Sequence, residues 1–425
     1  MKKENKEFIS NTLVYFVSNI LNAAIPFILL PILTRSLTPA EYGQVAIFQV
    51  TISALSAFVG FSVNGSAVRK FYSKEMQEAE YKKYLGACFQ ILLFSLCVIL
   101  SIVVLFSEYL VRWIGLSLDW IILAVISSAA LFLLQMRLMQ WQVRKKAKRY
   151  GAFQVSYSLT NLLISLFLVF SLYYGAEGRI AGIAISSIIF ALLSLYFLKR
   201  EKLIIFFTWN KRYIKEAINY GVYLIPHVSG IFLLSSVDRI VINSKLGMEQ
   251  AGIYMVAVQL CGVFTICFDA INKAFVPWLF ERLKRNLVNE LAQIVKFTYI
   301  YMCVLSFLCI VGYYVAPHFI GIVAGDEYLA AAQVVGILCV GQAFNGMYLM
   351  MTNYILYKKN TGVLSSITIS SGLINVLLSI HLIDSYGFQG VALSFVISML
   401  FRFITTWWFA SKSYSMPWLS FSTVK

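Results

Sequence analysis

The sequence predicts an all-α polytopic membrane protein with twelve transmembrane helices. Of its 425 residues, 60% are hydrophobic and only 13% are charged, and the mean hydropathy is +0.78. A soluble protein of this composition would have too few polar side chains to cover its surface, so a water-soluble globular fold and a disordered chain are both excluded. The apolar residues run in blocks of about 20 rather than alternating every second residue, which favours helices over a membrane β-barrel.

Twelve apolar blocks are long enough to cross a bilayer as helices. The first is too long for the apolar core of a signal peptide, so we expect it to remain in the mature protein as a transmembrane helix. The predicted spans cover residues 9–34, 43–66, 85–106, 119–139, 152–173, 180–198, 218–237, 251–275, 293–315, 331–351, 362–383 and 388–410.

The basic residues predict the orientation of these helices. Segments on one side hold 28 of the 35 lysines and arginines, the opposite segments hold five, and Arg137 and Arg402 lie within spans. Because loops rich in Lys and Arg stay in the cytoplasm, both termini are predicted to be cytoplasmic. The opposite-side loops are short, the longest covering residues 316–330. The net charge of +16 therefore reflects membrane topology, and no nucleic-acid partner is expected.

The seven cysteines all lie in apolar stretches. None forms a CxxC pair and no histidine stands at ligand spacing beside them, so we interpret them as small packing residues. The sequence predicts no metal site, no cofactor and no catalytic residue.

The two halves of the chain resemble each other at a shift of about 208 residues, which indicates a duplication of six helices. The matching pairs are Asn11–Tyr15 with Asn219–Tyr223, Leu37–Gly43 with Leu246–Gly252, Val63–Asn64 with Ile271–Asn272, Asn161 with Asn375, and Gly182–Ser186 with Gly390–Ser394. Because six is an even number, both halves enter the membrane in the same orientation and form a parallel repeat.

This duplication predicts two six-helix bundles that face each other across a central cavity, as in an alternating-access transporter. The predicted organisation is an N-terminal bundle at 1–200, a cytoplasmic linker at 201–217, a C-terminal bundle at 218–410 and a cytoplasmic tail at 411–425.

The first helix of each predicted bundle carries a polar stripe. The stripe runs from Asn11 to Asn22 in the first span and from Asn219 to His227 in the seventh, with polar residues three or four positions apart. Either these faces line a hydrated cavity, or they form hydrogen bonds between helices in a dry bundle.

Prolines interrupt the same two helices. Pro26, Pro31 and Pro226 each remove a backbone hydrogen bond and permit a bend. We predict that these prolines act as hinges; a static kink is the alternative.

Charged residues within spans cost about 3 kcal/mol or more each, which favours a functional role for them. Arg402 is the deepest cation, in the middle of the last span. Asp269 and Lys273 are four residues apart on one helix and can form an ion pair. Arg137 lies about one turn from the cytoplasmic end of its span, and we interpret it as reaching toward the interface along its long side chain.

Four further charged residues flank spans, and we interpret them as anchors at the membrane interface: Asp238, Arg239, Arg35 and Arg69. Arginine binds phosphate oxygens bidentately, and cations outnumber acids within the spans, so the cavity is predicted to suit a diphosphate better than a cationic drug. The candidate residues for binding the diphosphate or its sugars are Arg402, Lys273, Arg35, Arg69, Arg137, Arg239, Asn11, Asn219, Asn64 and Asn272.

Three runs resemble the Wzx-type polysaccharide repeat-unit flippases: Pro31–Gly43 (PILTRSLTPAEYG), Val237–Gly247 (VDRIVINSKLG) with the following Ala251–Tyr254 (AGIY), and Ala270–Leu283 (AINKAFVPWLFERL). The likeness covers essentially the whole chain. It implies the multidrug/oligosaccharidyl-lipid/polysaccharide exporter superfamily, with its MATE-like fold.

The resemblance implies movement of an undecaprenyl-diphosphate-linked oligosaccharide, of O-antigen (lipopolysaccharide) or capsule type, across the bacterial inner membrane. Membrane lipids are expected partners, and a polysaccharide polymerase and a chain-length regulator are candidate partners of a monomeric protein. If transport is coupled to protons, the candidates here are Asp269, Asp238 and His227.

Two other functions remain open. A drug antiporter of the same superfamily would need an acidic, aromatic-lined pocket, against which the excess of cations argues. A polysaccharide polymerase or ligase would need a long external loop with Arg and His. The 316–330 loop is short, and His318 is its only residue of these two types. The sequence also lacks a Gly-rich phosphate loop, so ATP hydrolysis by this chain is not expected.

Overall fold

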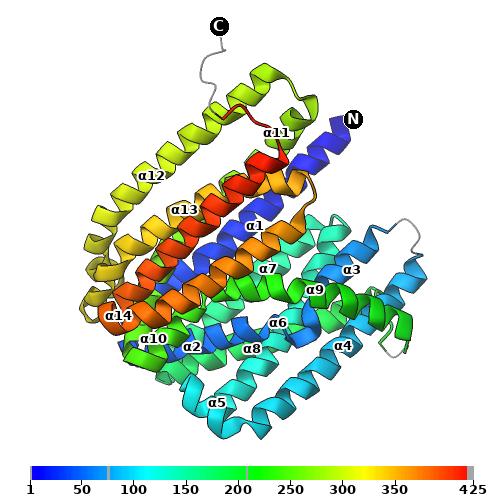
Figure 1. The fold of residues 1–425 in the computed structure, drawn as a ribbon. Helices are drawn as coiled ribbons and strands as arrows, with labels where there is room; N and C mark the ends of the chain where they lie inside the picture. The colour runs from blue at the N-terminus through cyan, green and yellow to red at the C-terminus, as the bar shows by residue number, and fades with distance from the viewer. Residues whose placement is uncertain (1, 74–76, 207–208, 419–425) are drawn as a thin grey trace. The chain divides into compact units, whose positions relative to one another are not determined.

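The computed structural model describes the backbone of residues 2–73, 77–206 and 209–418, and the side chains from residue 14 onwards within these ranges, except that of residue 16. Every regular element in this part of the chain is helical (Figure 1), which confirms the predicted all-α fold class.

The helices follow the predicted spans in order. The N-terminal half contains α1 (Lys2–Thr34), α2 (Pro39–Leu55), the 3₁₀ turn η1 (Val59–Ser62), α3 (Asn64–Phe71), α4 (Glu78–Leu105), α5 (Ser107–Ile114), α6 (Leu118–Val143), α7 (Ala147–Leu166), the π-helical turn η2 (Phe167–Ser171) and α8 (Gly175–Arg200). The C-terminal half contains α9 (Lys211–Ser235), α10 (Val237–Leu246), α11 (Met248–Arg285), α12 (Val288–Ala324), η3 (Asp326–Ala331), α13 (Ala332–Tyr357) and α14 (Thr361–Ser413).

Most of these helices can cross a membrane. Ten in the described ranges are long and apolar enough, and α2 with the η1–α3 segment forms a bent pair that adds an eleventh. Helix α14 is 53 residues long, far more than one span needs, and it leaves helical geometry at Gly387, between the two spans predicted there. The chain is a multi-pass membrane protein, and the count of twelve spans stays a prediction.

The chain divides into two compact units. Unit 1 comprises Met1–Ser229 with Gly247–Gly252, and unit 2 comprises Gly230–Leu246 with Ile253–Lys425. Helix α9 therefore begins in unit 1 and ends in unit 2. The bundle boundaries predicted at residues 200 and 218 stay predictions.

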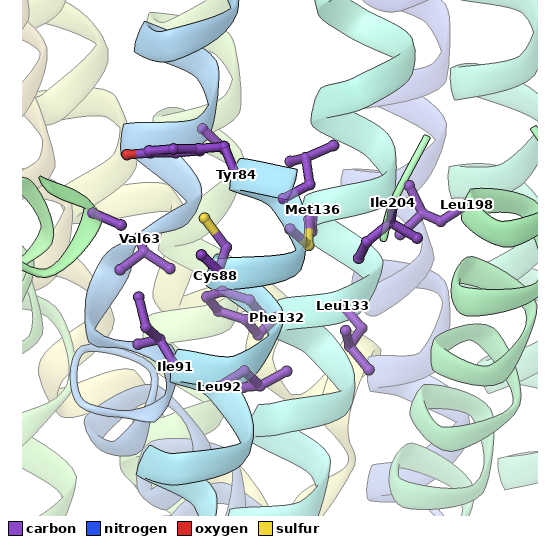
Figure 2. Packing of buried hydrophobic residues seen from close by; sticks show 14 of the residues in the cluster. Val63, Tyr84, Cys88, Ile91, Leu92, Phe132, Leu133, Met136, Leu198 and Ile204 are labelled. Atoms are coloured by element: carbon purple, nitrogen blue, oxygen red, sulfur yellow. The ribbon is translucent and has the colours of Figure 1, made fainter. Parts of the chain in front are cut away.

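Each unit has its own apolar core. In unit 1, Val63, Cys88 of α4 and Phe132 of α6 belong to one buried cluster (Figure 2). In unit 2, Phe268 and Phe403 belong to a cluster built from α11 to α14. Burial of these apolar side chains and close interhelical packing hold the helices of each unit together.

Local sequence sets the start of α2. Thr38 Oγ1 accepts a hydrogen bond from the Glu41 amide (3.3 Å), and the Glu41 carboxylate accepts one from the Thr38 amide (2.9 Å). This capping box, with Pro39 in the first turn, satisfies backbone donors that the helix leaves unpaired.

Gly43 and Gly252, which the repeat aligns, make reciprocal close contacts within unit 1. A Cβ added to Gly43 would lie 1.9 Å from the Met248 carbonyl oxygen, and one added to Gly252 would lie 2.0 Å from the Pro39 carbonyl oxygen. Pro39 and Met248 are themselves equivalent in the repeat. At both positions the close approach of another backbone leaves room only for glycine.

Candidate functional site: a basic and aromatic cavity in unit 1

A break in the second predicted span positions the site. The η1 turn leaves helical geometry at Gly60 and Phe61, and the helices on either side are bent by 59°. The Gly60 amide donates a hydrogen bond to Ser95 Oγ of α4 (2.8 Å). Phe61 and Ser62 both have positive φ, a conformation that surrounding packing must hold in place. The break makes α3 a separate short helix beside α4 and α9.

Helix α9 approaches this break closely. Asn210 Oδ1 accepts hydrogen bonds from the Arg212 and Tyr213 amides and so caps the start of α9. Nearly three turns after the start of α9, a Cβ added to Gly221 would lie only 2.1 Å from the Phe61 carbonyl oxygen. Glycine at this position therefore allows the backbones of α9 and η1 to come together.

Between α3, α4 and α9 lies a cavity of about 730 Å³, which we call the α3–α9 cavity. Two cations of α3, one acid and one amide of α9, four tyrosines and two serines line it: Arg69, Lys70, Glu216, Asn219, Tyr72, Tyr84, Tyr220, Tyr223, Ser66 and Ser73. All of them belong to unit 1.

The two cations in the cavity differ in their partners. Lys70 Nζ forms an ion pair with Glu216 Oε1 at 2.6 Å, which neutralises its charge. The Arg69 guanidinium lies 5.2 Å from the centre of the Tyr220 ring, and no described carboxylate lies within ion-pair distance of it. Arg69 therefore gives the cavity its net positive charge.

This arrangement suits a phosphorylated sugar. Guanidinium groups bind phosphate oxygens bidentately. Tyrosine rings offer apolar faces together with a hydroxyl group, and the Asn219 amide offers both a donor and an acceptor. Of the ten predicted binding residues, the structure brings Arg69 and Asn219 together here.

Arg137 lies elsewhere in unit 1, and its reach toward the membrane interface stays a prediction. Its side chain is 0% exposed, 2.6 Å from the Glu201 carboxylate, with its guanidinium 3.8 Å from the centre of the Trp141 ring. Burial alone would raise the pKa of the Glu201 carboxyl, but the hydrogen bond and charge of Arg137, helped by Lys146, hold it below its ordinary value.

The other predicted residues of unit 1 are scattered. Arg35 is exposed between α1 and α2. Asn64 is the first residue of α3, and its side-chain amide donates a hydrogen bond to the Phe132 carbonyl oxygen (3.4 Å). The side chain of Asn11 lies outside the described part of the chain.

The three predicted hinge prolines lie inside helices. Pro26 and Pro31 lie within α1, and Pro226 lies within α9, one residue before the half-buried His227. Pro26 also lines a smaller cavity of about 250 Å³.

In unit 2, Arg402 is buried. Its guanidinium stacks 3.6 Å from the centre of the Tyr348 ring, and its Nη2 lies 3.5 Å from Thr368 Oγ1. Among the described residues of unit 2, no carboxylate lies within ion-pair distance of it.

The remaining predicted residues of unit 2 are paired. Lys273 and Asp269 form the expected ion pair at 2.5 Å, about half exposed, while Asn272 accepts a hydrogen bond from Asn353 (2.7 Å). Asp238 and Arg239 lie 3.3 Å apart with side chains only 5% and 6% exposed, so they are buried in the fold rather than anchored at its surface.

Sequence reasoning missed two features. Arg179, which falls between the predicted spans 152–173 and 180–198, lies in the first turns of α8. It is buried there and donates to Asn161 Oδ1 (2.7 Å) and Ser165 Oγ (2.5 Å). Tyr72, Tyr84 and Tyr220 of the α3–α9 cavity were also missed, because they come from separate segments of the chain, whereas Tyr223 lies on the polar stripe predicted for the seventh span. Asn161, which accepts a hydrogen bond from Arg179, matches Asn375 in the repeat, and this match was the one sequence signal that pointed to the Arg179 cluster.

Comparison with known proteins identifies the class of this chain. Residues 8–283 match the model of the family described as polysaccharide biosynthesis protein. The chain belongs to this family, and the resemblance found from its motifs is confirmed.

One relative and two solved structures are similar to this chain. The relative is the "probable low-salt glycan biosynthesis flippase Agl15" of Haloferax volcanii, with 20% identity over 90% of this chain and 79% of that protein. An inward-facing multidrug resistance MATE family transporter of the MOP superfamily matches with a TM-score of 0.74, 14% identity, and 93% and 94% of the two chains covered. The lipid II flippase MurJ in an inward closed conformation matches with a TM-score of 0.70, 16% identity, and 95% and 87% covered. At these identities the two structures establish the fold, which is the predicted MATE-like one.

Proposed function

We propose that this chain is a flippase for an undecaprenyl-diphosphate-linked oligosaccharide repeat unit, of the O-antigen or capsule type. It carries this lipid from the cytoplasmic to the periplasmic leaflet of the bacterial inner membrane, with both of its own termini in the cytoplasm. The observation that carries the proposal is the α3–α9 cavity, which offers one uncompensated cation among tyrosines and an asparagine in a chain of the polysaccharide biosynthesis family.

In this proposal the parts of the substrate bind to different residues. Arg69 binds a phosphate group of the diphosphate, while Lys70, already neutralised by Glu216, holds the side of the cavity in place. Tyr220 packs against a sugar ring and Asn219 donates to or accepts from its hydroxyl groups. The prenyl chain stays in the surrounding lipid, because its transfer into a polar cavity would expose apolar area.

Helix α9 supports a hinge at Pro226. Gly221 packs against Phe61 in unit 1, whereas a Cβ added to Gly230 would lie 3.0 Å from the Ile369 nitrogen in unit 2. Pro226 stands between these two attachment points and removes one backbone hydrogen bond there. A change in the angle of α9 at Pro226 would move its two ends with different units, as alternating access requires.

The other candidate residues keep their predicted roles as part of the proposal. Further contacts for the diphosphate or sugars are Arg402, Lys273, Arg35, Arg137, Arg239, Asn11, Asn64 and Asn272. The candidates for ion coupling are Asp269, Asp238 and His227, and the further hinges are Pro26 and Pro31. The polymerase and the chain-length regulator act downstream of this monomeric transporter.

Two alternatives compete with the flippase. A multidrug antiporter is favoured by the likeness to the MATE transporter, but the α3–α9 cavity pairs its acid with a lysine and leaves an arginine uncompensated, so it would repel an organic cation. A polysaccharide polymerase or ligase is the second alternative, and no cluster in the described residues suggests its chemistry.

Deletion of the chain in its native host tests these three functions together. We expect loss of surface polysaccharide on a gel and accumulation of single lipid-linked repeat units, detected by mass spectrometry, on the cytoplasmic face. Expression of the wild-type chain in the deletion strain should restore the polysaccharide. Unchanged polysaccharide with altered drug sensitivity would instead identify an antiporter, and single units already on the periplasmic face would identify the polymerase.

A further inference from the structure

A second cavity in unit 1 lies where α6 and α8 end and α7 begins. Its volume is about 590 Å³, and it is separate from the α3–α9 cavity. The helix ends around it lie in two segments rich in Lys and Arg, 140–150 and 199–217.

Aromatic side chains from three helices form the floor of this cavity. The ring of Trp141 lies 5.1 Å from that of Phe153 and 5.8 Å from that of Phe197, measured between centroids. On α7, Arg149, Ala152 and Phe153 follow one another at helical spacing and line the cavity from one face. The cavity therefore combines an apolar interior with a charged opening.

Charge at the opening is unbalanced. A single carboxylate, that of Glu201, forms ion pairs with Arg137 (2.6 Å), Arg149 (3.1 Å) and Lys146 (3.5 Å). Arg200 also lines the cavity, and no described carboxylate lies within ion-pair distance of it. Several cations thus share one acid, and the opening attracts an anion.

Exposed apolar residues continue from this opening along both helices that flank it. On α8, Tyr196 and Leu192 lie one and two turns before Arg200, and Leu192 is 62% exposed. On α7, Leu159 and Leu163 follow the cavity residues, and Leu163 is 64% exposed. In a multi-pass membrane protein such surfaces contact lipid chains.

We propose that this cavity binds an anionic phospholipid. The phosphate group sits between Arg149 and Arg200, the glycerol backbone covers the aromatic floor, and an acyl chain follows the apolar surface of α7 or α8. A zwitterionic phospholipid lacks the net charge that the opening attracts. A sugar-linked diphosphate would meet an apolar floor that offers few groups for its hydroxyls. The inference is independent of which substrate the protein transports.

Native mass spectrometry of the purified full-length chain, titrated with phosphatidylglycerol or phosphatidylcholine, tests the proposal. The variant Arg149→Gln/Arg200→Gln should bind phosphatidylglycerol at least about tenfold more weakly, because each basic group near a membrane contributes substantially to binding an anionic lipid. The wild-type chain should prefer phosphatidylglycerol to phosphatidylcholine, and the variant should lose this preference.

A matched control removes the same two charges from neighbouring positions. Lys148 and Lys199 each stand one residue before a cavity arginine, are exposed and do not line the cavity. The variant Lys148→Gln/Lys199→Gln should change the affinity less than about twofold. An equal loss in both double variants would show attraction by overall charge and would overturn the proposal.

A third variant separates space from charge. Ala152→Phe fills the cavity from the exposed face of α7 and removes no charge, so it should also weaken phosphatidylglycerol binding by at least about fivefold. Undiminished binding would overturn the proposal. Competition with undecaprenyl phosphate is a further test. If this lipid displaced phosphatidylglycerol from the wild-type chain and bound the arginine variant more weakly, the site would belong to the carrier lipid, and the proposal would be overturned. Circular dichroism and gel filtration confirm that each variant is folded.

Discussion

Two buried arginines, Arg137 of unit 1 and Arg402 of unit 2, are held in different ways. In unit 1, Arg137 meets the carboxylate of Glu201 as well as the ring of Trp141. In unit 2, Arg402 stacks on the ring of Tyr348 and contacts Thr368, without a described carboxylate in reach. Aromatic rings attract cations but do not cancel their charge. Arg137 is therefore neutralised within the fold, whereas Arg402 remains a source of positive charge.

This difference separates a structural arginine from one suited to binding. A buried charge persists when a partner compensates it, and such a pair needs no ligand. An uncompensated charge calls for another anion or for water, so it is more often part of a functional site. By this criterion Arg402 is a stronger candidate for contact with a diphosphate than Arg137.

The largest effect is expected when Arg137 loses its partner. Glu201→Gln leaves a guanidinium with 0% exposure without its anion, which should lower the free energy of unfolding by about 3 kcal/mol. Thermal unfolding in detergent measures the change. The control is Glu216→Gln, which breaks the Lys70–Glu216 pair at the same 2.6 Å. Its carboxylate is 43% exposed, so the loss should stay below about 1 kcal/mol. Similar losses in the two variants would contradict the assignment of Arg137 as a neutralised, structural residue.

Arg402→Gln should produce the opposite result. Transport of the lipid-linked repeat unit should fall by about a hundredfold, because a desolvated arginine contributes about 2 kcal/mol or more to binding an anion. The free energy of unfolding should change less in Arg402→Gln than in Glu201→Gln. Reconstituted vesicles give the transport rate, and protein abundance in the membrane gives the folding control. Normal transport by Arg402→Gln at normal abundance would remove Arg402 from the proposed site.

Arg69→Gln should have a smaller effect on transport. The side chain is exposed in the α3–α9 cavity, where water weakens its interaction with phosphate, so a decrease of about tenfold is expected. Lys83→Gln is the matched control, because Lys83 is exposed near the start of α4 and does not line the cavity. If both variants lost transport equally, the effect would reflect surface charge rather than a contact in the cavity.

The all-α fold class could be predicted because the length of the apolar blocks is a property of the chain itself. The break at Gly387 falls between two predicted spans, and the repeat predicted the equivalence of Gly43 and Gly252 that the reciprocal contact displays. Both features depend on residues close in sequence or on a regular shift.

The candidate site was only partly predictable, because it depends on which helices meet. Arg69 and Asn219 were named from separate spans, but their meeting depends on the bend at Gly60 and on the close approach at Gly221. Position within a span also failed to indicate exposure: Arg137 is close to the end of its span, yet Glu201 from the end of α8 encloses it. Such long-range partners carry no local signal.

The smallest expected effect is a dependence on pH, which sharpens the assignment of Arg137. The neighbouring cations hold the pKa of Glu201 below the ordinary value of 4.5, so the folded chain favours the carboxylate more than the unfolded chain does. Its contribution to stability is complete above the unfolded pKa and is lost as the pH falls through the lower, folded pKa. The wild-type chain should therefore lose more stability between about pH 5 and pH 3 than Glu201→Gln, in which no carboxyl titrates at this position. Unfolding temperatures across this range measure the two slopes, and equal slopes would mean that Glu201 does not stabilise Arg137 through its charge.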